Sequence, residues 1–534
     1  MRGDEQYVSI PRMVLTNAQR FGAAEAVVDL DAGVRLSFEQ LGEQLVRSVK
    51  AAVALDIAPG DRVVLWAPNS ADWIIAALGV LGAGAILVPL NTRFKGAEAA
   101  YVISKSGASA VLTVPEFLGN NYLDMLDEAL PASDPVRRRM VLVGPGHAPG
   151  ATDWADYLDA GDTVPDEEAL ARIHAVGSDS ISDIMFTSGT TGAPKGVTLT
   201  HGQSLRVYAN LAEVFTFRPG DRQLIIPPFF HTLGYKAGWL ASLMTGATAL
   251  PQSDFDVDTV LKRLSEERIS VLLGPPTVYS EIIRHPRREE HDLSHLRVAA
   301  PTATKVAPEL IQQLRDVLGF KVVFSAYGLT EATSVVSTTH ADDDPAKVAH
   351  TVGRPVRDVD VKLVDDAGSE VFTGTPGEVL VRGYNVTQGY WKDPEATAKA
   401  IDGDGWLHTG DIGVLDEEGY LSIVDRKKDM FIVGGFNAYP AEIERALRQH
   451  DQVIDVAVVG VPDERLGEVG VAYVVAEPAL DSDELLDWVK GRLANFKVPR
   501  QVFFVDELPR NASMKVRKNV LRARYAEEPA PSQP

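Results

Sequence analysis

The chain alternates apolar, strand-like runs with helix-like segments along most of its length, and this alternation constrains the fold more than any other feature. The strand-like runs are residues 62–66, 181–186, 223–226, 270–273, 296–299 and 321–324. Several of them lack a polar face, which is typical of central strands that are covered on both sides. Helical patterns lie between them, as at 257–268 and 308–318. We therefore expect a layered α/β architecture.

A shorter unit with a different order of elements begins near residues 425–429 (DRKKD). Its patterns predict a helix at 440–450, strands at 453–459 and 469–476, a helix at 482–494 and a strand at 502–505. Because 534 residues exceed what one core accommodates, we expect an N-terminal domain at 1–425 and a small α+β domain at 426–525. The charged run between them is a candidate hinge, although a solvated loop would look the same. The tail, 526–534, is expected to be disordered.

Charge and cysteine content exclude several classes of function. The chain carries 52 basic and 74 acidic side chains, a formal net charge of −22, which disfavours nucleic acid as a partner. It has no cysteine, so disulfides, thiolate catalysis and Cys-ligated zinc are excluded. Any reacting thiol must therefore come from another molecule, and the composition fits a reducing cytoplasm.

One uncharged stretch, residues 73–90, is long enough to raise the question of a membrane span. Gly79, Gly82 and Gly84 interrupt it, and Pro89 lies near its end. A buried helix followed by a buried strand explains the stretch better. The N-terminus is acidic and lacks an apolar signal core. We therefore expect a soluble, cytoplasmic protein without a membrane span.

The segment that points most directly to chemistry is TSGTTGAPKG at residues 187–196, directly after a strand-like run. Its glycines let a ligand approach the backbone N–H groups, and its hydroxyls and lysine are donors suited to phosphate oxygens. Pro194 stands where a Walker loop has glycine, which disfavours a GTPase or kinase. Taken alone, the segment is also compatible with a polar surface turn. The candidate phosphate ligands are Thr187, Ser188, Gly189, Thr190, Thr191, Gly192 and Lys195.

This loop resembles the phosphate loop of the adenylate-forming superfamily, which includes acyl-CoA synthetases, peptide-synthetase adenylation domains and luciferases. Further segments resemble that superfamily in the same order: PFFH at 228–231, YGLTE at 327–331, GWLHTGD at 405–411, DR at 425–426 and NASMK at 511–515. The similar stretch covers most of the chain. The resemblance implies a large N-terminal domain of layered α/β subdomains, a small mobile α+β C-terminal domain, and the use of ATP, Mg²⁺ and CoA.

The YGLTE segment would contact adenine and the metal, as the resemblance implies. Tyr327 would stack on adenine with Gly328 and Thr330 beside it, although a lone tyrosine more often serves packing. Glu331 would hold Mg²⁺, a hard cation that prefers carboxylate and phosphate oxygens together.

The resemblance assigns four further side chains to the two substrates. Asp411 would accept hydrogen bonds from the ribose hydroxyls, or else cap a turn, and Arg426 would reach the ribose or the phosphate. Lys515 would bridge the carboxylate and the α-phosphate in the transition state, and is the proposed catalytic lysine. His231 would control the access of the carboxylate and of the thiol to the site. Alternatively, His231 has a purely structural role.

A rotation of the small domain would separate the two half-reactions in this superfamily. Lys428, by its position, is the pivot. Rotation would remove Lys515 from the site and bring Gly434 and Gly435 against it, where adjacent glycines let a pantetheine chain pass close to the backbone.

Two departures from the superfamily pattern bear on the expected activity. The turn after the strand-like run at 296–299 usually contains glycine but reads PTAT here, so Thr302 and Ala303 would narrow or polarise the acid pocket. Met514 replaces the glycine that usually precedes the catalytic lysine, where a positive φ would be uncomfortable for methionine. We still expect an active enzyme, with a lower rate, because the lysine itself is present.

We expect the second substrate to be CoA, because the chain ends soon after the proposed catalytic lysine and no carrier domain follows. Stretches at 229–238, 434–442 and 493–499 resemble actinobacterial CoA ligases of the bicyclic propanoate formed in steroid-ring breakdown. Phe230, Tyr235 and Lys236 would lie near the acid, favouring a cyclic or oxygenated acid over a long chain. A medium-size fatty acid is the alternative substrate, and a homodimer is a possible oligomeric state.

Three other functions are weighed against the ligase. An acyl-AMP ligase would load a carrier protein, a non-catalytic protein would bind nucleotide without releasing pyrophosphate, and a luciferase-like oxygenase would consume oxygen. The presence of every proposed catalytic side chain, in order, favours the ligase.

Overall fold

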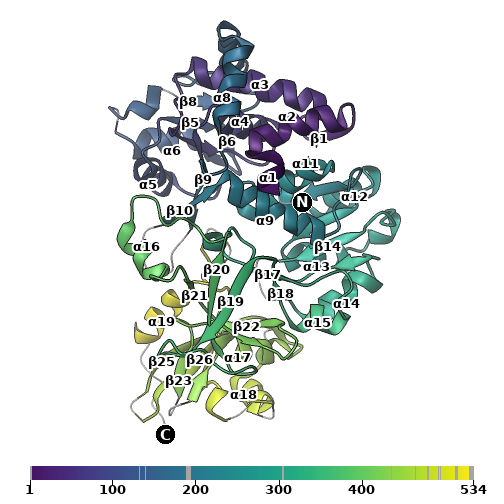
Figure 1. Ribbon diagram of the computed structural model, residues 1–534. Coiled ribbons are helices and arrows are strands. Elements are labelled where there is room, and N and C mark those ends of the chain that lie inside the picture. Colours follow the sequence, from purple (N-terminus) through teal and green to yellow (C-terminus); the bar gives the residue numbers. More distant parts are fainter. Residues whose placement is uncertain are drawn as a thin grey trace. The chain divides into compact units, whose positions relative to one another are not determined.

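The computed structural model describes residues 3–131, 133–138, 140–187, 194–302, 306–433, 436–463, 465–477, 480–490, 492–493, 495–511 and 515–527. The chain forms two compact units (Figure 1). The first unit comprises the described residues up to Asp360 and, in addition, Val381–Leu407. The second comprises Val361–Leu380 and the described residues from His408 onward.

A seven-stranded sheet with the order β15-β14-β13-β11-β12-β1-β2 forms one layer of the first unit. Its strands are β1 (Glu25–Asp29), β2 (Val34–Ser37), β11 (Arg222–Ile225), β12 (Thr248–Pro251), β13 (Val271–Gly274), β14 (Val298–Pro301) and β15 (Val322–Val323). All neighbours pair in parallel except β1 and β2. Helices α12 (Val257–Glu266), α13 (Pro276–Arg284) and α14 (Pro308–Asp316) bury Leu261, Ile282 and Leu314 in a core shared with the sheet.

A six-stranded sheet with the order β10-β9-β4-β3-β5-β8 also belongs to the first unit. Its strands are β3 (Arg62–Trp66), β4 (Ile86–Pro89), β5 (Ala110–Thr113), β8 (Met140–Leu142), β9 (Ile181–Thr187) and β10 (Lys195–Thr200). Only β10 runs antiparallel to its neighbour. The uncharged stretch at 73–90 forms most of helix α4 (Ala71–Gly82), in which every residue but Asp72 is buried, and strand β4. This confirms the interpretation as a buried helix followed by a buried strand.

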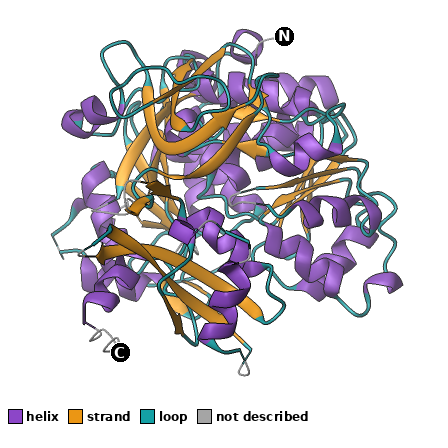
Figure 2. Ribbon diagram, turned by 90° about the horizontal axis from the view of Figure 1, so that it is seen from below, coloured by secondary structure: helices purple, strands orange, loops and turns teal. Residues whose placement is uncertain are grey.

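Helices and short strands complete the first unit, and Figure 2 shows strands gathered into sheets with helices against them. The longer helices are α2 (Ile10–Phe21), α3 (Phe38–Ala54), α5 (Gly96–Ser106), α6 (Tyr122–Ala129), α8 (Asp166–Ala175) and α9 (His201–Val214). The shorter ones are α1 (Gly3–Tyr7), α7 (Trp154–Ala160), α10 (Thr232–Gly234), α11 (Ala241–Thr245), α15 (Pro345–His350) and α16 (Pro394–Ala400). The short strands are β6 (Glu116–Phe117), β7 (Asn120–Asn121), β16 (Ala326–Tyr327), β17 (Ser337–Thr338) and β18 (Arg354–Pro355).

The second unit contains a five-stranded sheet and most of a four-stranded one. The four-stranded sheet is formed by β19 (Val359–Val364), β20 (Gly377–Gly383), β21 (Leu407–Leu415) and β22 (Leu421–Arg426). The five-stranded sheet is formed by β23 (Phe431–Val433), β24 (Phe436–Ala438), β25 (Val453–Asp463), β26 (Gly467–Ala476) and β27 (Gln501–Phe504). Its helices are α17 (Pro440–Arg448), α18 (Ser482–Lys490) and α19 (Lys518–Glu527).

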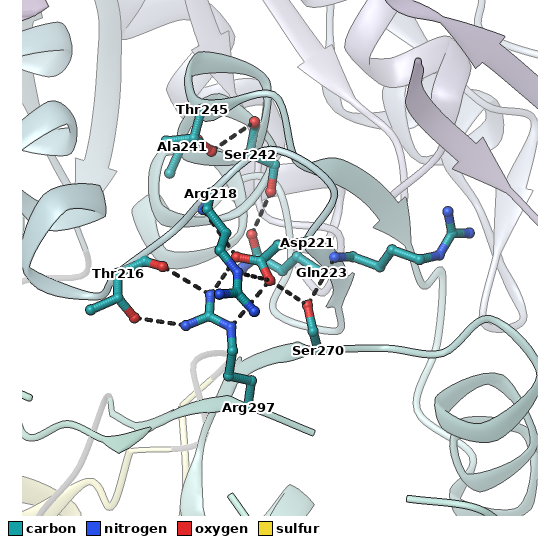
Figure 3. A network of polar contacts seen from close by, with 10 residues as sticks. Thr216, Arg218, Asp221, Gln223, Ala241, Ser242, Thr245, Ser270 and Arg297 are labelled. Atoms are coloured by element: carbon teal, nitrogen blue, oxygen red, sulfur yellow. Dashed lines mark hydrogen bonds and ion pairs between the residues drawn. The ribbon is translucent and has the colours of Figure 1, made fainter. Parts of the chain in front are cut away.

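A partly buried polar network ties together the amino ends of three parallel strands in the first unit (Figure 3). Asp221 precedes β11, Ser270 precedes β13 and Arg297 precedes β14. Arg297 forms an ion pair with Asp221, and the Ser270 hydroxyl donates to Asp221 Oδ1 at 2.9 Å. Arg297 also donates to the Thr216 carbonyl at 2.9 Å. The network therefore joins β11, β13 and β14 at the amino edge of the sheet, opposite the edge at which these strands end.

The expected α/β class, with a large N-terminal part and a small C-terminal α+β part, is confirmed. Individual boundaries shift: β14 begins two residues after the run expected at 296–299, and α18 ends at Lys490 rather than at 494. The proposed domain boundary at 425/426 stays a prediction. Helix α19 includes residues 526–527 of the expected tail, and 528–534 lie outside the described residues. Among the described residues, no helix combines the length and apolarity needed to cross a membrane.

Candidate active site

The order of strands in the seven-stranded sheet predicts where the first unit binds a ligand. The chain runs from β11 to β12 on one side, and then returns to β13 on the other side of β11. Open α/β sheets bind ligands at the carboxyl ends of strands where the order reverses in this way. The segment that follows β11 contains Phe230 and His231, and the segment that follows β14 begins with Thr302. The fold therefore brings these sequence-predicted residues to the same edge of one sheet.

Only the two flanks of the predicted phosphate loop belong to the described residues. Thr187 ends β9, Lys195 begins β10, and the two residues face each other across the antiparallel pair. The Lys195 side chain is exposed to solvent. Ser188, Gly189, Thr190, Thr191 and Gly192, which were expected to bind phosphate, lie outside the described residues.

Glu331 and Lys195 are connected through a residue that the sequence did not single out. The Tyr390 hydroxyl donates to Glu331 Oε1 at 3.0 Å, and the Lys195 ammonium lies 4.8 Å from the centre of the Tyr390 ring. Burial, and then the Glu331 charge, raise the pKa of Tyr390, so the phenol stays protonated and acts as a donor. Nothing in the local sequence marks Tyr390, because a lone tyrosine is usually a packing residue.

The segment from Tyr327 to Ser334 forms a tight turn that presents Glu331. A Cβ atom at Gly328 would lie 2.1 Å from the Ser334 carbonyl oxygen, so only glycine fits there. Thr333 and Ser334 have φ angles of 50° and 65°, a left-handed conformation that is rare for side-chain-bearing residues. Such strained positions cluster at functional sites.

Thr330 and Glu331 lie in a single 3₁₀ turn, Thr330–Ala332. The Glu331 carbonyl accepts the Thr387 N–H at 2.7 Å, which holds this turn against the segment that carries Tyr390. Tyr327 lies in β16, half-buried, directly before the turn. The fold thus keeps the proposed adenine contact and the proposed metal ligand on one rigid element.

His231 is the N-cap residue of helix α10 and is exposed. Its Nδ1 accepts the Leu233 N–H at 3.2 Å, so in the neutral ring the proton lies on Nε2. The next residue, Thr232, shares a hydrogen bond with the Ser334 hydroxyl at 2.5 Å. Through this contact the His231 segment is joined to the turn that presents Glu331. Phe230, one residue earlier, is half-buried.

Tyr235 and Lys236 are fully buried within a short π-helical turn, Tyr235–Leu240. The Lys236 ammonium lies 2.9 Å from Asp183 Oδ1 and donates to the Ser204 hydroxyl at 2.8 Å. Both charged side chains have no exposed surface. Lys236 is therefore engaged by the strand that leads into the phosphate loop, since Asp183 belongs to β9. The sequence offered no sign of this partner, because Asp183 lies inside an apolar run.

Two of the predicted acid-pocket residues have buried hydroxyls without a hydrogen-bond partner among the described residues. These are Thr302 Oγ1 and Tyr235 Oη. The Tyr235 ring stacks on Trp239 with 4.9 Å between ring centres. The Thr302 N–H donates to the Gly274 carbonyl at 3.0 Å, which fixes the residue at the carboxyl end of β14. Ala303 lies outside the described residues.

Asp411 and Arg426 lie directly opposite each other on β21 and β22 in the second unit. Arg426 Nε lies 2.7 Å from Asp411 Oδ1. The carboxylate is almost fully buried, whereas the guanidinium is 44% exposed. Two residues assigned separately from the sequence therefore form one ion pair at the edge of the second unit's sheet.

The proposed hinge begins where β22 ends. Asp425 accepts the N–H groups of Arg426 and Ala441, both at 2.7 Å, and so links the end of β22 to helix α17. Lys428 follows in the chain, and its pKa is lowered because burial removes water from its ammonium and because Arg426 lies nearby. Lys515 lowers it further, which puts the two lysines within electrostatic range of each other.

Lys515 belongs to the second unit and is hydrogen-bonded to Asn511. Its N–H donates to Asn511 Oδ1, and its carbonyl accepts the Asn511 N–H, both at 2.9 Å. The side chain is exposed to solvent. Met514, the departure from the superfamily pattern, lies outside the described residues, as do Gly434 and Gly435.

The described residues contain no cluster of three or more metal-ligating side chains. A single carboxylate suits Mg²⁺ in a nucleotide site, because that ion commonly takes one or two carboxylates together with substrate phosphates. Glu331 meets this requirement: one of its oxygens is occupied by Tyr390, and the described residues offer the other no partner. The donor set therefore fits a Mg²⁺ ion that is shared with a nucleotide.

Comparisons with known proteins show the family to which the chain belongs. The family of AMP-binding enzymes matches residues 14–391, and the AMP-binding enzyme C-terminal domain matches residues 442–515. A 3-[(3aS,4S,7aS)-7a-methyl-1,5-dioxo-octahydro-1H-inden-4-yl]propanoyl:CoA ligase of Rhodococcus jostii is 48% identical over 97% of this chain and 99% of its own length. A ligase of the same name from Mycobacterium tuberculosis is 46% identical over 91% of this chain and 94% of its own length.

Among solved structures, ATP-bound MatB from Rhodopseudomonas palustris superimposes with a TM-score of 0.85 at 30% identity. The match covers 97% of this chain and 99% of that protein. The chain belongs to the AMP-binding enzyme family, as a member of its AMP-forming acyl-CoA synthetase branch.

Proposed function

We propose that this acyl-CoA synthetase activates a ring-bearing propanoic acid, such as a propanoate of steroid-ring degradation, and transfers its acyl group to CoA. The observation that carries this choice of acid is the buried Thr302 hydroxyl, which lacks a partner among the described residues. A buried polar group without a partner costs about 1–3 kcal/mol. A ring ketone would accept from this hydroxyl and remove that cost, and the two relatives act on an acid with two ring ketones.

In the first step, a carboxylate oxygen of the acid attacks the α-phosphorus of ATP, and pyrophosphate leaves. Lys195 and the loop that precedes it would hold the pyrophosphate oxygens. Lys515 would neutralise the negative charge that the carboxylate and the α-phosphate share in the transition state. The Asp411–Arg426 pair would orient the ribose, with the Asp411 carboxylate accepting from its hydroxyls.

Glu331 would hold Mg²⁺ with its second carboxylate oxygen. Bound there, the ion would neutralise charge on the departing phosphates. Tyr327, on the element that precedes Glu331, would contact adenine. With these assignments, one short segment of the first unit would supply both the adenine contact and the ligand of the metal ion.

In the second step, the thiol sulfur of CoA attacks the acyl carbonyl carbon of the adenylate. The acyl–phosphate bond breaks, AMP leaves, and the thiol proton passes to solvent. His231 would gate this route from the edge of the acid site. A rotation of residues 426–525 about Lys428 would withdraw Lys515 and bring Gly434 and Gly435 into its place.

The acid pocket would select a compact ring system over an extended chain. Phe230 and Tyr235 flank His231 on the segment after β11, and Thr302 approaches from β14. Lys236 is already held by Asp183 and Ser204, so it would support this wall from behind rather than contact the acid. The donors available to ring oxygens are therefore hydroxyls.

The test is a panel of acids with ATP, Mg²⁺ and CoA, comparing kcat/KM for ring-bearing propanoates with kcat/KM for medium-chain and long-chain fatty acids. We expect the cyclic dioxo acid to be preferred. A panel in which long-chain acids win and cyclic keto acids are inert would contradict the proposal.

Thr302→Val and Thr302→Ser separate the hydroxyl from the shape of the side chain. We expect Thr302→Val to lower kcat/KM for the dioxo acid about tenfold or more and to leave octanoate unaffected, since one hydrogen bond is lost. Thr302→Ser keeps the hydroxyl and should retain the preference. An equal loss for both acids in Thr302→Val would assign the residue to packing.

A further inference from the structure

Tyr390 lies between two opposite charges of the candidate nucleotide site. Its hydroxyl donates to Glu331 Oε1 at 3.0 Å, and its ring faces the Lys195 ammonium with 4.8 Å to the ring centre. No ion pair joins Lys195 directly to Glu331 in the part of the chain that the structure describes. The aromatic residue therefore contacts both charged groups, one through its hydroxyl and the other through its ring.

The backbone around Tyr390 is fixed to strand β10, the strand that begins with Lys195. Tyr390 forms an isolated bridge with Val197, and the Trp391 N–H donates to the Gly196 carbonyl at 2.7 Å. The Thr198 N–H donates to the Gly389 carbonyl at 3.1 Å. These bonds attach residues 389–391 to the edge strand β10, so hydrogen-bonded backbone fixes the position of the ring.

A second set of contacts fixes the same segment to Glu331. The Thr387 N–H donates to the Glu331 carbonyl at 2.7 Å, and the Thr387 hydroxyl donates to the Thr198 carbonyl at 2.7 Å. The Tyr390 N–H donates to the Thr397 hydroxyl at 2.9 Å. Residues 387–391 thus join strand β10 to the turn that contains Glu331.

We propose that Tyr390 is a positioning residue for the nucleotide: it orients the Glu331 carboxylate toward the metal and keeps the Lys195 ammonium available to phosphate. This inference rests on the proposed function, in which Glu331 holds Mg²⁺ and Lys195 holds the pyrophosphate. It adds a residue that touches neither the acid nor CoA.

Two physical effects follow from the geometry. A neutral phenol that donates to one carboxylate oxygen fixes the side chain and leaves the second oxygen for a cation. A cation and an anion that are free to meet would pair with each other, and the nucleotide would then have to break that pair before binding. The ring prevents this pairing, while its face still stabilises the ammonium.

Tyr390→Phe removes the hydroxyl and keeps the ring. We expect the affinity for ATP with Mg²⁺, measured by titration calorimetry, to fall about tenfold, which is typical for loss of a group that orients a metal ligand. The affinity for ATP in excess EDTA should not change. Loss of affinity only in the presence of the metal is a signature that general damage to the fold would not produce.

The matched control is Tyr384→Phe. Tyr384 precedes that segment in the chain, and its hydroxyl accepts from Asn210 Nδ2 at 2.8 Å rather than donating to Glu331. This variant should bind both forms of ATP like the wild type. If Tyr390→Phe retains wild-type affinity for ATP with Mg²⁺, or loses both forms equally, the orienting role is overturned.

Tyr390→Ala tests the separation of charges. With the ring gone, Lys195 can pair with Glu331, so affinity for metal-free ATP should fall as well. Adding Glu331→Gln to this variant removes the competing anion and should restore that affinity. If the double variant binds metal-free ATP no better than Tyr390→Ala, the ring does not act as a spacer.

These measurements need neither the acid nor CoA. A failed acid panel would therefore overturn the proposed substrate and leave the role of Tyr390 standing. Unchanged nucleotide binding in the Tyr390 variants would overturn that role and leave the acid panel intact.

Discussion

His201 provides a quantitative test of the interior of the first unit. It begins helix α9, is only 1% exposed, and its Nδ1 accepts the Ile10 N–H at 3.3 Å. Burial, assisted by the positive charge of Lys236, lowers the pKa of His201 to about 3. The folded protein therefore keeps this imidazole neutral under conditions in which an exposed histidine is charged.

The sign and size of the effect follow from proton linkage. In the unfolded chain the pKa of His201 returns to about 6.5, so between roughly pH 6.5 and 3 the unfolded state binds a proton that the folded state does not. Stability is therefore fully present above about pH 6.5 and is lost as the pH falls. Between pH 7.5 and 5.0 the loss amounts to about 2 kcal/mol, at 1.36 kcal/mol per pH unit below the unfolded pKa.

The assay is urea unfolding at pH 7.5 and pH 5.0, followed by tryptophan fluorescence, for the wild type and for His201→Asn. Asparagine keeps an acceptor close to the position of Nδ1 but does not titrate. Six of the seven tryptophans belong to the first unit, so the signal reports mainly on the part of the chain that contains His201.

Acidification should lower the free energy of unfolding of the wild type by about 2 kcal/mol more than that of His201→Asn. Because other titrating groups are common to both proteins, only the difference between the two pH dependences matters. Equal pH dependence in the two proteins would show that His201 is not kept neutral in the folded state.

Three further predictions concern the candidate site. Asp411→Asn should raise KM for ATP about tenfold to a hundredfold in steady-state assays, because a charge-assisted hydrogen bond contributes about 1.5–3 kcal/mol. The melting temperature should change little. An unchanged KM for ATP would show that Asp411 does not bind the ribose. Gly328→Ala should abolish most activity and destabilise the fold by about 1–3 kcal/mol, since the added Cβ would collide with the Ser334 carbonyl. Gly274→Ala is the control and should be tolerated, because the nearest atom to its added Cβ would be Val278 Cγ2 at 3.9 Å. Lys515→Ala should stop adenylate formation but still convert a supplied acyl-adenylate and CoA to thioester; loss of both half-reactions would contradict its assignment to the first step alone.

The fold class could be predicted because apolar runs that form central strands, and the helices between them, leave a direct pattern in the sequence. The uncharged stretch at 73–90 was interpreted correctly because its glycines and Pro89 distinguish a buried helix and strand, α4 and β4, from a membrane span. The order of strands left no such pattern. That β11 lies between β12 and β13 depends on contacts between segments far apart in the chain.

The candidate site was predictable where a residue belongs to a local motif. Asp411 and Arg426 could be named from their segments, but their direct pairing follows from the register of β21 and β22. Asp183 and Tyr390 could not be found, because an aspartate in an apolar strand and a lone tyrosine carry no local signal. Their roles arise only from the partners that the fold brings to them, Lys236 for one and Glu331 for the other.

The most direct test of the account follows AMP and free thiol together, in one reaction containing the cyclic dioxo propanoate, ATP, Mg²⁺ and CoA. Each AMP released should be matched by one thiol consumed, and both signals should be absent in Lys515→Ala. Release of AMP or pyrophosphate while the thiol stays unchanged would contradict this prediction, and would direct the adenylate to a carrier protein or to an oxidative second step.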